Sequence, residues 1–133
     1  MKLRIRGDTL RIRLKRGEVE QVAAGSPIVE ETHFPTSVLT CRLELSADGD
    51  FSADFQSGSL VVRLPSAEVL SWAGSDEVSL FAEQKLSDAR SISLLIEKDF
   101  ACLEPGHHRD CDDDADTYPH PSGPAGGSGN VDP

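Results

Sequence analysis

Aromatic residues are scarce in this chain: its 133 residues include one Trp, one Tyr and five Phe. A core with so few rings must be filled mostly by Leu, Val, Ile and Ala. No apolar run approaches the roughly eighteen residues that a membrane-spanning helix needs. The basic N-terminus also lacks the apolar stretch of a secretory signal. We therefore expect a cytoplasmic protein that makes no contact with a membrane.

Signs of catalysis are also missing. The chain has no Gly-rich phosphate loop, no His-Glu-x-x-His and no Gly-x-Ser-x-Gly. Cys41 shares a strand face with Leu39 and Leu43, so we expect an inert core thiol, and His33 ends a strand with no evident acid to orient it. The odd count of three cysteines favours reduced thiols over a disulfide framework. We expect no enzymatic activity and no cofactor.

Charge is abundant but uneven, with a net value of −10 for the whole chain. Residues 1–16 hold seven basic side chains and one acid, whereas residues 104–133 hold seven acids and one base. Opposite charge at the two ends suggests an interaction surface or a self-interaction.

The first basic segment has the period-two alternation of a β-strand, once before and once after Gly7-Asp8. A Gly-X pair suits a two-residue type II′ turn, so these segments should form a hairpin. That turn would place Arg6 opposite Thr9 and Arg4 opposite Arg11. One face of the hairpin is then apolar, and the other sets like charges against each other, which costs a few tenths to about 1 kcal/mol per pair.

The rest of the chain to residue 98 continues with short strands and two short helices. Helices are expected over 16–24, which Gly25 ends, and from Pro65 onward. The expected strands span residues 28–34, 38–45, 51–55, 59–64, 78–83 and 92–98, and Ser57-Gly58 forms a second hairpin turn.

Two stretches fifty residues apart are alike. Leu10-Arg-Ile-Arg-Leu14 precedes Glu18-Val19, and Leu60-Val-Val-Arg-Leu64 precedes Glu68-Val69. We therefore predict a mainly β (α+β) domain over residues 1–103, built from two ββαββ repeats at about 2–46 and 51–98. The repeats would be fused into one pseudo-two-fold barrel or sandwich, as a monomer.

Residues 104–133 are acidic and rich in Pro and Gly, a composition that cannot offset chain entropy, so we expect a disordered tail. Tyr118 is the exception, a lone aromatic that could dock on the domain.

Each half resembles the AbrB/MazE type of swapped-hairpin domain. The second copy is the better match, through Gly58-Ser-Leu-Val-Val-Arg-Leu-Pro65 and the following Glu68-Val69. The resemblance implies interlaced hairpins and, as in many members, DNA binding through basic residues. The opening Met1-Lys-Leu-Arg-Ile-Arg-Gly7, the segment Glu97–Leu103 and the ending Asp116–Pro121 also resemble a family of small uncharacterised bacterial proteins, which implies no specific activity.

The basic hairpin is the sharpest candidate site for nucleic acid or another anion, because two-stranded ribbons fit a major groove and guanidinium groups suit phosphates. Its residues are Lys2, Arg4, Arg6, Arg11 and Arg13. The second half has no such face, since the matching positions hold Ser52, Asp54, Gln56 and Val61. In the alternative reading, the arginines pair with Glu30, Glu31 or Glu44, or with the acidic tail.

A second candidate lies in the tail, where four metal-ligating side chains fall within ten residues: Cys102, His107, His108 and Cys111. They could enclose zinc, although the spacing matches no strong zinc motif.

The best interpretation is a small non-enzymatic binding or scaffolding domain, whose partner is another protein or its own acidic tail screening the hairpin. A nucleic-acid-binding regulator and a metal-responsive tail are the alternatives.

Overall fold

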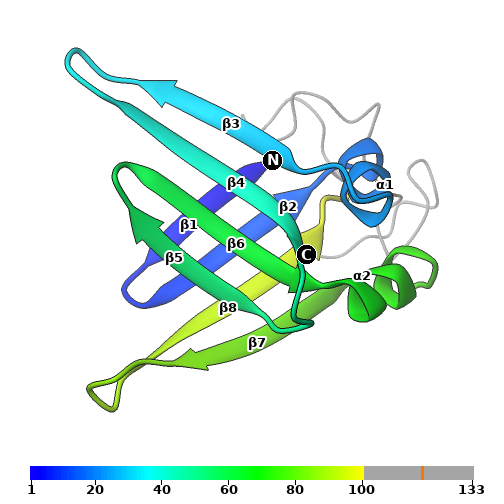
Figure 1. The fold of residues 1–133 in the computed structure, drawn as a ribbon. Helices are drawn as coiled ribbons and strands as arrows, with labels where there is room; N and C mark the ends of the chain where they lie inside the picture. The colour runs from blue at the N-terminus through cyan, green and yellow to red at the C-terminus, as the bar shows by residue number, and fades with distance from the viewer. Residues whose placement is uncertain (101–117, 119–133) are drawn as a thin grey trace, which may run out of the picture.

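The structure is a computed structural model that describes residues 1–100 and Tyr118 (Figure 1). Within that part of the chain the elements are β1 (Lys2–Arg6), β2 (Thr9–Leu14), α1 (Arg16–Ala23), β3 (Ile28–His33), β4 (Val38–Ser46), β5 (Ser52–Gln56), β6 (Ser59–Pro65), α2 (Ser66–Ala73), β7 (Ser79–Lys85) and β8 (Ser91–Lys98). The predicted strands and helices are all present, with ends that differ by a residue or two.

The strands form two four-stranded sheets. Sheet A has the order β1-β2-β8-β7, and sheet B has the order β3-β4-β6-β5. Hairpins supply every antiparallel pair, and the two central pairs, β2–β8 and β4–β6, are parallel. Each sheet therefore joins a hairpin from the first half of the chain to a hairpin from the second half. The four hairpin turns lie at one end of the molecule and the helices at the other (Figure 1).

The first hairpin has the predicted register, with Arg6 opposite Thr9 and Arg4 opposite Arg11. Gly7 has φ +55°, and Asp8 is outside the left-handed region, which is what a type II′ turn requires. In the β5–β6 turn both Ser57 (φ 52°) and Gly58 (φ 79°) are left-handed, as in a type I′ turn. Both turns therefore connect their strands through two residues, but in different backbone conformations.

Both helices are short and cover the end of the molecule opposite the turns (Figure 1). In α1 the Lys15 N–H donates to Glu18 Oε1 (2.9 Å), which is the glutamate half of a capping box. The buried helix positions are Val19, Val22, Val69 and Trp72. Helix α2 begins at Ser66 and not at Pro65, because Pro65 is still extended and pairs with Ser46. Among the described residues, no helix is long and apolar enough to cross a membrane.

The core lies between the inward faces of the two sheets and the buried sides of the helices. Its fully buried side chains come from β2, β4, β6, β8 and both helices: Ile12, Leu14, Val19, Val22, Leu43, Val62, Leu64, Val69, Trp72, Leu94 and Ile96. The two central parallel strand pairs thus supply most of the interior. The single Trp, Trp72 of α2, is fully buried among aliphatic side chains, as the composition led us to expect.

The predicted fold class is correct in being mainly β with two short helices, but the closed barrel is wrong. In the described residues, β1 and β7 are free edges of sheet A, and β3 and β5 are free edges of sheet B. Contacts with side chains bridge these edges, for example from the Ala53 N–H to Gln84 Oε1 (2.8 Å). A barrel needs a continuous backbone ladder around its circumference, and these bridges do not supply one.

Tyr118 docks on the domain, as its isolation in the sequence predicted. It forms a parallel bridge with Phe100, and its N–H donates to the Asp99 carbonyl oxygen (2.9 Å). Its ring meets that of Phe100 at 5.8 Å between centroids, and the guanidinium of Arg16 lies 5.2 Å from the Tyr118 ring centre. The predicted disorder of residues 104–133 and the boundary at residue 103 otherwise lie outside the described residues.

Candidate functional site

The outward face of the β1–β2 hairpin carries the five predicted basic side chains. Leu10, Ile12 and Leu14 alternate with them along β2 and are buried, so the basic positions point away from the core. We call this surface the cationic face, and its members are Lys2, Arg4, Arg6, Arg11 and Arg13.

Part of the cationic face is paired with acids. Arg11 Nε lies 2.7 Å from Glu97 Oε1, and Arg13 Nε lies 3.5 Å from the same oxygen. The side chain of Glu97 is 17% exposed, so this shared ion pair is partly shielded from water. Lys2 Nζ lies 3.2 Å from Oδ2 of the buried Asp99. The pairs arise because β8 runs parallel beside β2, with Glu97 next to Arg13.

Within the described part of the chain, the rest of the cationic face has no acidic partner. Arg4 and Arg6 are exposed, and no carboxylate of a described residue lies within 4 Å of either guanidinium. Arg4 stands directly across the hairpin from Arg11, a like-charged neighbour. Such an arrangement is unfavourable by up to about 1 kcal/mol, and an anion between the side chains would relieve it.

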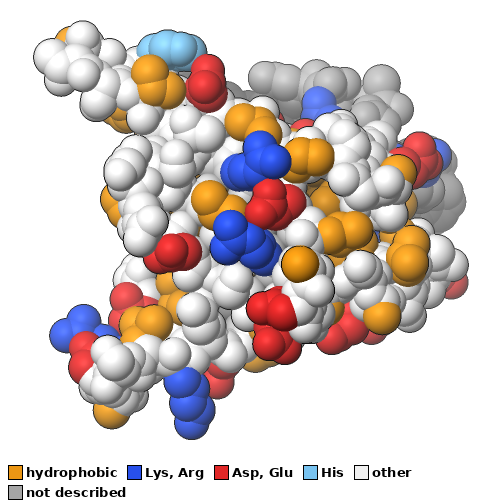
Figure 2. Space-filling model, in the orientation of Figure 1, with side chains coloured by type: hydrophobic (Ala, Val, Ile, Leu, Met, Phe, Trp, Pro, Cys, Tyr) orange, Lys and Arg blue, Asp and Glu red, His pale blue; other side chains and the backbone are white. Residues whose placement is uncertain are grey.

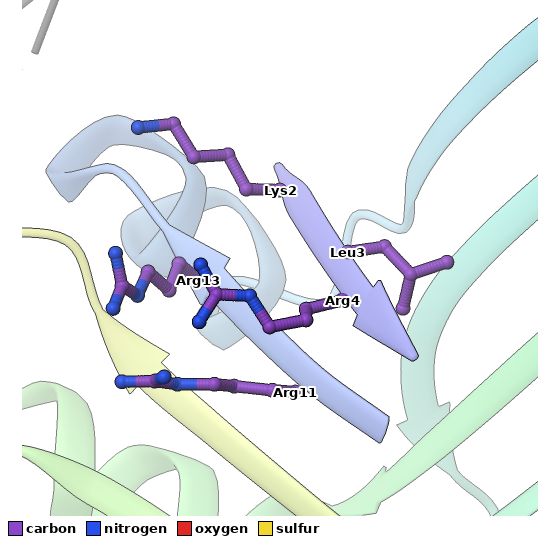
Figure 3. Close-up of a pocket in the computed structure, with 5 residues that line it drawn as sticks. All are labelled: Lys2, Leu3, Arg4, Arg11 and Arg13. Atoms are coloured by element: carbon purple, nitrogen blue, oxygen red, sulfur yellow. The ribbon is translucent and has the colours of Figure 1, made fainter. Parts of the chain in front are cut away.

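A hollow opens on the cationic face where the arginines converge. The described residues that line it are Lys2, Leu3, Arg4, Arg11 and Arg13. Arg4, Arg11 and Arg13 extend to the same side of the hairpin, whereas Leu3 points to the other side (Figure 3). Planar guanidinium groups present paired N–H donors, the geometry that binds phosphate and carboxylate oxygens.

Sheet B provides a comparison within the same molecule. Its outward Arg42 and Arg63 both contact Glu44, at 2.5 and 2.9 Å. The hydrogen bond from Arg42, with that from Arg63, holds the pKa of Glu44 below its usual range. In the space-filling view, basic side chains over β4 and β6 lie against acidic ones (Figure 2). Asp54 of β5 lies opposite Val61 of β6. The corresponding position in sheet A, opposite Arg11, holds Arg4. The outward surface of sheet B is therefore mixed in charge.

Glu30, Glu31 and Glu44, the three glutamates suggested as partners of the hairpin arginines, have other partners, and the acidic tail, the remaining suggestion, lies outside the described residues. Glu44 pairs with arginines of its own sheet, and Glu30 contacts the amino group of Met1 at 2.8 Å. Glu31 lies 3.8 Å from the exposed His33. The partner that sequence reasoning missed is Glu97, whose alternation with Leu94 and Ile96 along β8 marked it as outward-facing.

The thiol considered as a nucleophile is in the core. Cys41 is buried, as predicted, and burial raises the pKa of its thiol, which disfavours the reactive thiolate at neutral pH. His33 is exposed at the end of β3, and its ring nitrogen is too far from Glu31 for a hydrogen bond.

The predicted metal ligands Cys102, His107, His108 and Cys111 lie outside the described residues. Within residues 1–100 and Tyr118, no group of three or more His, Cys, Asp or Glu side chains is arranged to hold a metal ion.

Sequence reasoning also missed a buried cation. Lys98 is 5% exposed and faces inward on β8, in line with Leu94 and Ile96. Its Nζ donates to the Ser75 carbonyl oxygen (2.7 Å) just beyond the C-terminus of α2, and lies 5.6 Å from the Trp72 ring centre. Burial lowers the pKa of Lys98. The available signal was a lysine at the fourth inward position of β8, after Ile92, Leu94 and Ile96. Its contacts join β8 to α2.

Comparison with known proteins places the chain in a family without assigning an activity. No curated protein and no solved structure matches it. One family model covers residues 1–122, which is most of the chain. On that match, the protein belongs to the family described as "Family of unknown function (DUF7009)".

Proposed function

We propose that the protein is a non-enzymatic binding domain of the fused swapped-hairpin type, and that its cationic face binds nucleic acid through phosphate groups. The resemblance to AbrB/MazE-type domains motivates this proposal, and the arrangement of charge on sheet A supports it.

The duplicated, swapped-hairpin reading draws support from the symmetry of the strand pairing. In sheet A the Ser93 N–H donates to the Asp8 carbonyl oxygen (2.8 Å), and in sheet B the Thr40 N–H donates to the Gly58 carbonyl oxygen (2.9 Å). Each bond ties the start of a strand in one half to the turn of a hairpin in the other. Two such units related by a pseudo-two-fold axis would give this pattern.

The observation that carries the binding proposal is the surplus of positive charge on one sheet. Among the described residues, two of the four arginines of the cationic face, Arg11 and Arg13, share the carboxylate of Glu97. Arg4 and Arg6 have none, whereas the corresponding positions of sheet B hold Asp54 and Gln56. A surface of exposed guanidinium groups binds phosphates with release of counterions, even on a protein whose overall charge is negative.

Fluorescence anisotropy with labelled single-stranded and duplex DNA tests the proposal. The protein should bind at about 50 mM salt and lose affinity steeply by about 200 mM. The double variant R4A/R6A should bind more weakly and lower the slope of log K against log salt by about two, one for each lost phosphate contact. Both side chains are exposed, so the variant should keep its fold.

The matched control is R42A/R63A, which removes the same charge from the outward face of sheet B. It should bind DNA as the wild type does. Equal losses in both double variants would mean that only net charge matters. Absence of binding by the wild type at low salt would reject nucleic acid as the ligand and leave the scaffolding interpretation.

A further inference from the structure

An aromatic ring lies on the same face of sheet A as the arginines. Phe81 of β7 pairs with Leu95, Leu95 pairs with Arg11, and Arg11 pairs with Arg4. Directly paired residues point to the same side of a sheet. The outward surface of sheet A therefore carries a row of side chains from Arg4 on one edge, which has no carboxylate partner among the described residues, to Phe81 on the other.

Phe81 is 62% exposed, although it sits in the middle of a strand. Its neighbours along β7, Leu80 and Ala82, face inward, and Leu80 is buried, so the core is filled without the Phe81 ring. In sheet B the position that corresponds to Phe81 is occupied by Val29, which pairs with the outward-facing Arg42. Sheet A thus differs from sheet B both in its surplus of arginines and in this ring.

The spacing along the row suits an extended nucleotide chain. Neighbouring strands lie about 4.8 Å apart, so Phe81 is about 10 Å from Arg11 and about 14 Å from Arg4 across the sheet. Glu83 occupies the next outward position of β7, which disfavours a phosphate there. The β7 edge is therefore suited to an uncharged aromatic base, and the β1–β2 side to the phosphates.

We infer that the cationic face selects single-stranded nucleic acid, with phosphates on Arg4 and Arg11 and one unpaired base stacked on Phe81. This inference rests on the proposed function and adds the class of ligand. In a duplex the faces of the bases are already stacked on each other and cannot reach a ring on a sheet surface. In a single strand they can, and such a stack contributes about 1–3 kcal/mol per base.

The test compares a labelled oligothymidylate with a duplex of equal length, both titrated with the full chain. The single strand should bind more tightly. Phe81→Ala should weaken single-strand binding by about 5- to 150-fold, the range for loss of one stacked base, and leave duplex binding unchanged. Phe81→Tyr, which keeps a ring, should bind as the wild type does.

Phe55→Ala is the matched control, because Phe55 is also 62% exposed but pairs with the inward-facing Leu60 of sheet B. It should not change binding. Equal effects of the two alanine variants, or no effect of Phe81→Ala, would overturn the stacking inference. If R4A/R6A still weakened binding in that case, the proposed nucleic-acid binding would hold without the stacking on Phe81. If the wild type bound neither probe, both would fail.

Discussion

The contact between the β5–β6 turn and β4 gives a sharp prediction about stability. Gly58 has φ +79°, and a Cβ atom at this position would lie 3.1 Å from the Val38 carbonyl oxygen. The carbonyl of Gly58 itself accepts the Thr40 N–H at 2.9 Å. The backbone of the turn therefore lies directly against the neighbouring strand, and glycine permits this approach. Gly58→Ala should be clearly destabilising.

The magnitude follows from two separate costs. A left-handed conformation destabilises the folded state of an L-residue by roughly 1–2 kcal/mol. Replacing glycine also lowers the conformational entropy of the unfolded chain, which offsets about 0.4–1 kcal/mol of that loss. The collision with a backbone oxygen adds about 1–3 kcal/mol, as in other overpacked sites. Gly25, which ends α1, has φ +92°, and Gly25→Ala meets only the first cost, because nothing lies within 4 Å of its added Cβ. We expect a loss of about 2–4 kcal/mol for Gly58→Ala and about 1 kcal/mol for Gly25→Ala.

Urea unfolding monitored by circular dichroism gives the free energy of unfolding of both variants, and thermal melts give their melting temperatures. For a domain of about a hundred residues, 1 kcal/mol corresponds to roughly 4–8 °C in melting temperature. Gly58→Ala should therefore melt at least about 4 °C below Gly25→Ala. Equal losses in the two variants would refute the close packing of the β5–β6 turn on β4.

Three further predictions concern charge. Glu97→Gln removes the carboxylate shared by two arginines of the cationic face, so DNA affinity in the anisotropy assay should rise; an unchanged affinity would show that these arginines do not reach the ligand. Glu44 has a pKa below 4.5 in the folded protein, so its ion pairs stabilise the fold above pH 4.5, and this contribution is lost as the pH falls through the lowered pKa. Urea midpoints measured down through that range should fall more steeply for the wild type than for Glu44→Gln, and parallel curves would contradict the pairing. The triple variant D112N/D113N/D114N keeps Tyr118 and should bind DNA more tightly if the acidic tail screens the cationic face; unchanged affinity would contradict such screening.

Local features of the fold could be predicted from the sequence. The register of the first hairpin follows from the alternation of charge and a Gly-Asp turn, and both determinants lie within thirteen residues of the chain start. The burial of Cys41 follows from the same alternation along β4. These predictions hold because period two assigns each side chain to a face before any long-range contact forms.

Long-range features could not be predicted. The pairing of Arg11 with Glu97 joins residues separated by 86 positions and depends on β8 lying parallel to β2. Whether the sheets close into a barrel depends on how the edge strands meet, and no local pattern encodes that geometry. The inward Lys98 was visible as a break in an apolar alternation, but its role required the position of α2.

The fold and the cationic face both depend on sheets that each combine hairpins from both halves of one chain. Interstrand NOEs in a ¹⁵N- and ¹³C-labelled sample test this most directly. We predict NOEs that connect β2 with β8, including Arg11 with Leu95, and β4 with β6, including Leu43 with Val62. NOEs that instead pair β2 with β3 or β4, within the first half, would contradict the interlaced sheets and the single cationic face built on them.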